Sequence, residues 1–234
     1  MPTLYIIATP IGNMEDITCR ALRILGEVGG LACEDTRRTR RVYERYSIDM
    51  PSKVFSYHEH NEDRAGARIL DVLNQGENVA LCSNAGYPGI SDPGYRIIRS
   101  VIESEHNLEV IPGANAVELA LLYSGLPTSS YTFKGFPPRK RGALVRFLEM
   151  EKDSPHTLIF YESPYRVGKF LSCALETLGN RHAAVCIEMT KKFERIKRGP
   201  LSQLHTEFDG VTVKGEVTIV VAGNNPKFIN KPVE

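Results

Sequence analysis

The sequence lacks both common glycine-rich phosphate motifs. Its 234 residues contain no GxxxxGK[ST] segment and no GxGxxG segment. The first motif cradles phosphates in P-loop NTPases, and the second binds the pyrophosphate of a dinucleotide. Their absence disfavours an NTPase and a nicotinamide enzyme.

Cysteine and long apolar runs are also scarce. The 5 cysteines are odd in number, lie far apart and form no CxxC pair, which argues against a disulfide framework or a zinc site and suits a reducing compartment. No apolar run approaches the ~20 residues of a membrane span. Met1 is followed by strand-like residues without the basic start of a signal peptide. We therefore expect a cytoplasmic protein.

Charge is nearly balanced overall but unevenly distributed along the chain. The formal net charge is +1, yet residues 1–126 hold 12 Lys and Arg against 17 Asp and Glu, while residues 127–234 hold 17 against 11. Such asymmetry can mark a nucleic-acid surface, and at this size it can also arise by chance.

The stretch from Val79 to Tyr95 stands out in composition. Val79 to Cys82 is an apolar run typical of a buried strand, residues 83–94 are rich in turn formers, and apolar residues then recur at helical spacing. Strand-to-helix connections usually have about 2–6 residues, and longer structured ones are often functional. Because ligands bind beyond the carboxyl ends of strands in open α/β sheets, we predict a ligand loop made of backbone groups. The alternative is an ordinary connection.

The chain divides into two predicted α/β domains, residues 1–126 and 127–234, at the turn-rich stretch 125–130. In the first, strands alternate with helices, including one that Asp16 is expected to cap, and this predicts a mostly parallel sheet covered on both faces. In the second, fewer helices per strand predict a mixed sheet. Its predicted strands span 131–136, 157–161, 183–189 and 216–222, and its predicted helices span about 142–151 and 164–178.

Ten short motifs occur in one order along the chain. They are ATPIGN (8–13), EDTRRTR (34–40), YHEHNE (57–62), SNAGYPGISDPG (83–94), PGANA (112–116), SGLPT (124–128), KGFPPRK (134–140), YESPYR (161–166), EMTKKFE (188–194) and GEVTIVVAG (215–223). Through them the sequence resembles the ribosomal RNA small subunit methyltransferase I family of the tetrapyrrole methylase superfamily.

The resemblance implies two α/β domains with S-adenosylmethionine in a cleft between them, and a homodimer. It also implies 2′-O-methylation of a cytidine ribose in small-subunit (16S) ribosomal RNA, a reaction that needs no metal. The cofactor contacts that it implies are Asn84, Ala85, Gly86, Ile90, Asp92, Pro112, Gly113, Ala116, Tyr161, Glu162, Met189 and Thr190.

Two residues are candidates for catalysis. Asp35 follows a predicted strand and can accept a proton or cap the next helix. Lys191 can stabilise an alkoxide or bind phosphate, or it can be a solvated surface residue. Glu162 can equally make a structural hydrogen bond. His58 and His60 would share one face of a strand, but no third metal ligand is evident.

Basic clusters suggest an RNA-binding surface, although such runs are often simply solvated. The RNA-binding candidates are Arg37, Arg38, Arg139, Lys140, Arg141 and Lys192. The aromatic residues Tyr57, Tyr87 and Phe136 are candidates for stacking on a base.

The chain departs from the family pattern in places. Asn84 replaces the usual Asp and Tyr87 the usual Thr, so any contact that needs a carboxylate is in question. The chain stops about a dozen residues after Ala222, so we expect it to lack the small extra domain of many members. Two other functions stay open: a tetrapyrrole or other small-molecule methyltransferase, and a non-catalytic ribosome-binding protein.

Overall fold

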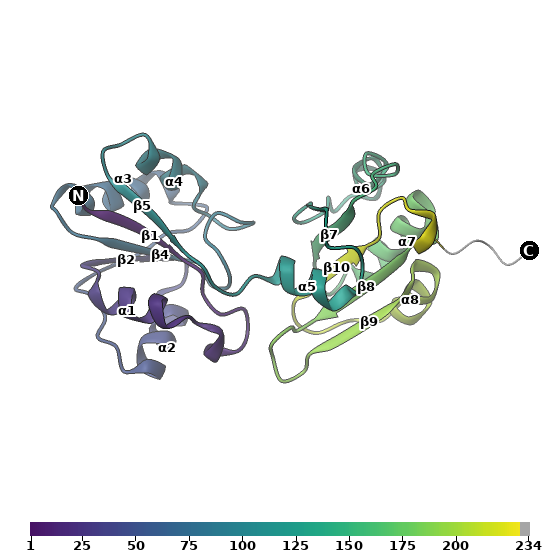
Figure 1. The fold of residues 1–234 in the computed structure, drawn as a ribbon, viewed down its shortest axis with the longest axis horizontal. Helices are drawn as coiled ribbons and strands as arrows, with labels where there is room; N and C mark the ends of the chain where they lie inside the picture. The colour runs from purple at the N-terminus through teal and green to yellow at the C-terminus, as the bar shows by residue number, and fades with distance from the viewer. Residues whose placement is uncertain (230–234) are drawn as a thin grey trace, which may run out of the picture. The chain divides into compact units, whose positions relative to one another are not determined.

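The chain packs as two units, Met1–Asn115 and Ala116–Glu234 (Figure 1). The structure is a computed structural model, and it describes residues 1–229. The sequence-based boundary after Leu126 lies at the other end of α5 (Ala116–Ser124), a helix that packs within the second unit. The last five residues of the predicted second domain lie outside the described part of the chain.

The first unit is built on a parallel five-stranded sheet of order β3-β2-β4-β1-β5. Its strands are β1 (Thr3–Ile7), β2 (Gly30–Cys33), β3 (Lys53–Ser56), β4 (Val79–Cys82) and β5 (Asn107–Ile111). The inner strands are buried on both faces, which explains why their sequences are continuously apolar.

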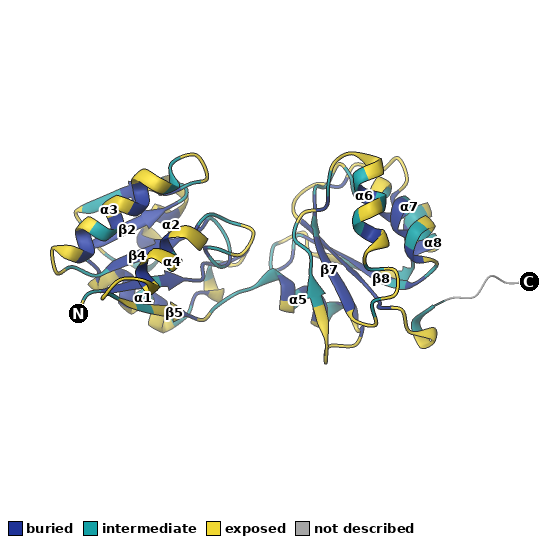
Figure 2. Ribbon diagram, turned by 90° about the horizontal axis from the view of Figure 1, so that it is seen from above, coloured by how far each residue is buried: buried dark blue, intermediate teal, exposed yellow. Residues whose placement is uncertain are grey.

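Helices cover both faces of this sheet (Figure 1), and the inner strands between them are buried (Figure 2). Helices α1 (Cys19–Glu27) and α2 (Thr36–Tyr46) pack on the face that carries Ala80 and Cys82. Helices α3 (Glu62–Asn74) and α4 (Tyr95–Ile102) pack on the face that carries Leu81, as the two-residue period of a strand requires. The predicted α/β architecture of this half is confirmed.

The second unit has the predicted mixed sheet, of order β6-β7-β10-β8-β9. Among its described strands, β6 and β7 are parallel neighbours, and the other pairs are antiparallel. Its strands are β6 (Tyr131–Phe133), β7 (Thr157–Glu162), β8 (His182–Ile187), β9 (Arg195–Pro200) and β10 (Val217–Val221). Helix α5 covers one face, and α6 (Arg141–Glu149), α7 (Val167–Leu178) and α8 (Leu201–Phe208) cover the other.

Several local predictions were wrong. Asp16 does not cap α1, because it ends a short 3-10 helix (Met14–Asp16), and the Thr18 hydroxyl caps α1 instead by accepting from the Ala21 N–H. Helix α7 begins at Val167 rather than Pro164, and β9 and α8 were not predicted at all. A second short 3-10 helix (Pro226–Phe228) follows β10. Over residues 1–229, no helix combines the length and the apolar character that crossing a bilayer requires.

Candidate functional site

The candidate site of the first unit lies at the carboxyl edge of its parallel sheet, where the segments after β1, β4 and β5 are bonded together. The long loop after β4 is in the middle of this edge because β4 lies between β2 and β1. Gly86 in this loop exchanges two backbone hydrogen bonds of 2.9 Å with Thr9, which follows β1. The Thr9 hydroxyl also donates to the Ser83 carbonyl at 3.1 Å.

Asn84 is half-buried and follows the buried Ser83 in the loop. Its backbone N–H donates to Glu34 Oε2 at 3.2 Å, so the segment after β2 also supports the loop. Its side-chain oxygen Oδ1 is buried and accepts no hydrogen bond within residues 1–229. An unsatisfied buried acceptor costs about 1–3 kcal/mol. The site therefore holds an acceptor that an N–H or O–H group of a ligand would satisfy.

Tyr87 joins the loop to the segment after β5. Its hydroxyl oxygen accepts the Gly113 N–H at 3.0 Å. Gly113 is itself closely packed, since a Cβ atom there would lie 2.9 Å from the Ala8 Cβ and 3.2 Å from the Ala8 carbonyl oxygen. The Pro112-Gly113 turn is thus a firm backbone platform whose Gly113 amide is bonded to protein.

The end of the loop forms a closed turn. The Gly89 N–H donates to the Pro93 carbonyl at 3.1 Å, and Ile90 and Ser91 at the tip are exposed. Ser91 has a φ of 59°, in the left-handed region that few non-glycine residues adopt. The loop is therefore held at both ends and presents a short exposed tip between them.

Asp35 caps helix α2. Its Oδ1 accepts the Arg37 backbone N–H at 2.9 Å, and the Arg37 guanidinium reaches Oδ1 at 3.2 Å and Oδ2 at 3.0 Å. The bond from this guanidinium lowers the pKa of Asp35 to about 2, with the backbone bond adding to the effect. This geometry favours the capping alternative, because so acidic a group holds a proton weakly.

Glu162 ends β7 in the second unit and is buried. Its Oε1 accepts the Ser163 N–H at 2.6 Å, and its Oε2 lies 3.2 Å from Arg166 Nη2. Burial raises the pKa of the Glu162 carboxyl, although the Ser163 hydrogen bond and the Arg166 charge both act to lower it. Arg166 also donates to the carbonyls of Pro137 at 3.2 Å and Pro138 at 2.9 Å. The pair thus fixes the turn that precedes the basic segment 139–141.

Lys191 lies in the turn between β8 and β9, two residues after Met189. Its Nζ donates to Glu188 Oε1 at 2.7 Å and to Glu216 Oε2 at 3.1 Å. Burial opposes the charge on Lys191, but the bonds to the two carboxylates outweigh it and raise the pKa of the ammonium. Lys191 is therefore a cation held between two acids.

The remaining cofactor candidates are spread over both units. Ile90 and Asp92 lie at the loop tip, Ala116 is the first residue of α5, and Tyr161 belongs to β7. Thr190 follows Met189 and has a φ of 64°.

The predicted RNA-binding cations are all exposed, but not all are unpaired. Arg37 pairs with Asp35, and Arg141 pairs with Glu176 at 2.5 Å. The other four make no ion pair in the described part of the chain: Arg38, Arg139, Lys140 and Lys192.

The aromatic and histidine candidates differ in their settings. Tyr57 cannot stack on a base, since its side chain is buried. Phe136 is exposed, and its ring centroid lies 5.5 Å from that of Tyr161. His58 and His60 lie in a turn after β3 rather than on a strand, so the predicted strand geometry was wrong. Among residues 1–229, no three His, Cys, Asp or Glu side chains are grouped to hold a metal ion.

Sequence reasoning missed two residues that support these segments. Glu34 holds the loop at Asn84, and Arg166 holds the turn at Pro137 and Pro138; neither was a candidate from the sequence. The backbone groups that they bind lie 50 and 28 or more residues away in the chain, so no local pattern marks them.

Comparison with known proteins agrees with this architecture. The profile of the Tetrapyrrole (Corrin/Porphyrin) Methylases matches residues 3–205. A Halalkalibacterium halodurans protein named ribosomal RNA small subunit methyltransferase I is 46% identical over 225 residues, which are 96% of this chain and 77% of that protein. A Bacillus subtilis protein of the same name is 40% identical over 231 residues, 99% of this chain and 78% of that protein.

Solved structures share the fold at low sequence identity. Diphthine synthase has a TM-score of 0.72 at 14% identity, covering 94% of this chain and 90% of its own. Uroporphyrin-III-C-methyltransferase from Thermus thermophilus has a TM-score of 0.64 at 17% identity, covering 94% of each chain. At these identities the likeness concerns the fold alone. The family profile and the two sequence relatives show that the chain belongs to the tetrapyrrole (corrin/porphyrin) methylases and, among them, to the group named ribosomal RNA small subunit methyltransferase I.

Proposed function

We propose that the protein is an S-adenosylmethionine-dependent methyltransferase that modifies the 2′-hydroxyl of a cytidine ribose in small-subunit (16S) ribosomal RNA. The observation that carries this proposal is the 46% identity, over 96% of the chain, to a relative named ribosomal RNA small subunit methyltransferase I. The anchored loop 83–94 supports it, because a rigid backbone surface suits a reaction that depends on positioning.

The proposed donor-binding residues of the first unit are Asn84, Ala85, Gly86, Ile90, Asp92, Pro112 and Gly113. The bound cofactor would supply an electrophilic methyl group on a sulfonium. The unsatisfied Asn84 Oδ1 fits such a ligand, which carries ammonium and hydroxyl donors. We propose the same role for Ala116, Tyr161, Glu162, Met189 and Thr190 of the second unit.

Of the two residues proposed for catalysis, Lys191 fits an electrostatic role. Its raised pKa keeps it protonated at neutral pH, and a fixed cation stabilises a developing alkoxide. Asp35 is ionised at neutral pH but binds a proton weakly. As a proton acceptor it would therefore contribute little.

We propose that the RNA is held through phosphate contacts from Arg38, Arg139, Lys140 and Lys192, with lesser contributions from the paired Arg37 and Arg141. Phe136 is the proposed stacking residue because its ring is exposed and backed by Tyr161. We further propose that the protein acts in the cytoplasm as a homodimer.

The test is a transfer assay with labelled S-adenosylmethionine and unmethylated small ribosomal subunits, followed by mapping of the label. We expect label on one cytidine ribose. Label on a base, or none despite cofactor binding, would reject the proposed substrate. Label on a porphyrinoid but not on RNA would identify a small-molecule methyltransferase, and absence of cofactor binding would indicate a non-catalytic binder.

A further inference from the structure

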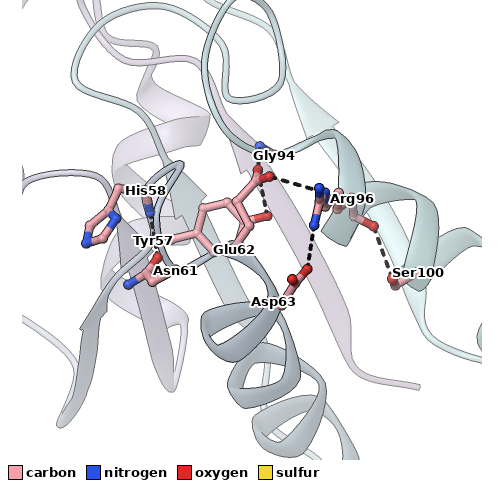
Figure 3. Close-up of polar contacts among 8 residues, drawn as sticks. All are labelled: Tyr57, His58, Asn61, Glu62, Asp63, Gly94, Arg96 and Ser100. Carbon is pink, nitrogen blue, oxygen red and sulfur yellow. Dashed lines mark hydrogen bonds and ion pairs between the residues drawn. The ribbon is translucent and has the colours of Figure 1, made fainter.

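The end of the loop, just beyond its exposed tip, is tied to helix α3 by a hydrogen bond. The backbone N–H of Gly94, the last residue of the loop, donates to Oε1 of Glu62 at 3.0 Å. Glu62 is the first residue of α3, 32 positions earlier in the chain. Figure 3 shows the Glu62 carboxylate directed toward the Gly94 backbone.

Gly94 is the last residue of the turn that carries the exposed tip. Its φ of 149° is rarely adopted by other residues, and a Cβ atom there would lie 2.8 Å from the Gly89 nitrogen. Because Gly89 also donates to the Pro93 carbonyl, residues 89–94 form one closed turn. A shift of the Gly94 amide would therefore move the turn that carries Ile90 and Asp92.

The Glu62 carboxylate is itself held in place (Figure 3). The buried Tyr57 hydroxyl donates to Oε1 at 3.3 Å, and Arg96 Nε lies 3.6 Å from Oε2. Only 18% of the Glu62 side chain is exposed. Arg96 is oriented in turn by Asp63 at 2.7 Å. A carboxylate with this many partners can fix a backbone amide in one position.

We propose that Glu62 is a positioning residue, which sets the tip of the donor-binding loop through the Gly94 amide. This inference rests on the proposed function, since the position of the tip matters to affinity only if the loop binds the cofactor. Glu62 need not touch the cofactor, because its effect passes through Gly94.

Three variants distinguish the effect of the Glu62 side-chain length from the effect of its charge. Glu62→Asp keeps the negative charge, but its shorter side chain moves the carboxylate oxygen away from the Gly94 N–H. Glu62→Gln keeps the side-chain length but removes the charge. Asp71→Ala is the matched control, because it removes an exposed carboxylate from the same helix, nine residues beyond Glu62. The readouts are the Kd for S-adenosylmethionine by calorimetry and the amide exchange of residues 83–95 in the free protein.

We expect Glu62→Asp to raise the Kd about tenfold, which is 1.4 kcal/mol, and to speed exchange in the loop. Glu62→Gln should raise the Kd less than about threefold, and Asp71→Ala should leave it unchanged. If Glu62 acted through its charge or through helix stability, Glu62→Gln would raise the Kd more than Glu62→Asp does. That order of affinities would overturn the proposal. Equal affinity and exchange in all variants would also overturn it.

The wild-type titration separates the two claims. If the wild-type protein binds no S-adenosylmethionine, the proposed function fails. If the wild type binds and the Glu62 variants match Asp71→Ala, only the role of Glu62 fails.

Discussion

The side chain of Asn84 combines a structural cost with a proposed ligand contact. Its Oδ1 is buried without a hydrogen-bond partner in the described residues, while its backbone N–H is held by Glu34. A group that is unsatisfied in the free protein and satisfied by a ligand trades stability for binding.

Asn84→Ala tests this trade. We expect the free energy of unfolding of the ligand-free protein to rise by about 1 kcal/mol, because the orphaned acceptor is removed. We expect the Kd for S-adenosylmethionine to rise about tenfold, because one ligand hydrogen bond is lost. Urea unfolding and calorimetry measure the two effects. Loss of stability with unchanged affinity would mean that Asn84 is purely structural.

Asp35 gives a pH-dependent prediction. The Arg37 side chain is the main cause of its folded-state pKa of about 2, against about 3.9 in an unfolded chain. A depressed carboxyl pKa stabilises the fold above the unfolded pKa, and this stabilisation is lost as the pH falls toward the folded pKa. We expect the wild type to exceed Asp35→Asn in free energy of unfolding at neutral pH, with the difference shrinking below about pH 4. A difference that stays constant from neutral to acid pH would contradict the assignment.

At the scale of elements, one buried arginine joins three segments of the second unit. Arg181 is 1% exposed, and its guanidinium donates to the carbonyls of Leu178 at 2.8 Å, Ala222 at 3.3 Å, and Lys152. These carbonyls lie at the end of α7, just after β10 and in the turn beyond α6. Burial lowers the pKa of Arg181, and the carbonyls compensate part of the cost of burying its charge.

We therefore expect Arg181→Met to lower the free energy of unfolding by about 3 kcal/mol, because it removes the donor to two buried carbonyls, those of Leu178 and Ala222. Arg195→Met is the matched control. Arg195 is exposed on β9, and its replacement should change stability by less than about 0.5 kcal/mol. Thermal and urea unfolding of both variants give the comparison. Equal stability of the two would show that water or neighbouring groups replace the guanidinium.

The elements also show how far the sequence predicts the fold. Strand β4 was predicted with the bounds that the structure has, since it is a short apolar run, and helix α2 begins directly after Asp35, its proposed cap. Strand β9 was missed because RIKRGP is a polar edge strand, paired only with β8. Helix α8 did carry a signal, as Leu201, Leu204 and Phe208 recur on one face.

The site was less predictable than the fold. The glycine-rich loop after β4 was predicted from its composition and its length. The carboxylates that support it did not, because Glu34 and Glu62 reach it from 50 and 32 residues away. Such contacts arise from sheet order and helix placement, and a linear pattern does not record them.

At the scale of the whole molecule, the uneven charge of the two halves bears on RNA binding. We expect Arg139→Ala combined with Lys140→Ala to weaken RNA binding and to flatten its salt dependence by about 0.7–0.9 per lost phosphate contact. The double variant Arg23→Ala with Arg99→Ala is the matched control. It removes the same charge from guanidiniums already paired with Glu27 and Glu103. An unaltered salt slope would mean that Arg139 and Lys140 do not contact RNA phosphates.

The central claim is that the backbone surface formed by residues 83–94 and 112–116 binds S-adenosylmethionine. Amide exchange measured with and without the cofactor tests this claim most directly. We expect saturating cofactor to slow exchange in peptides covering these two segments and to leave exchange in α1 and β9 unchanged. Saturable binding that leaves both segments unprotected would contradict it.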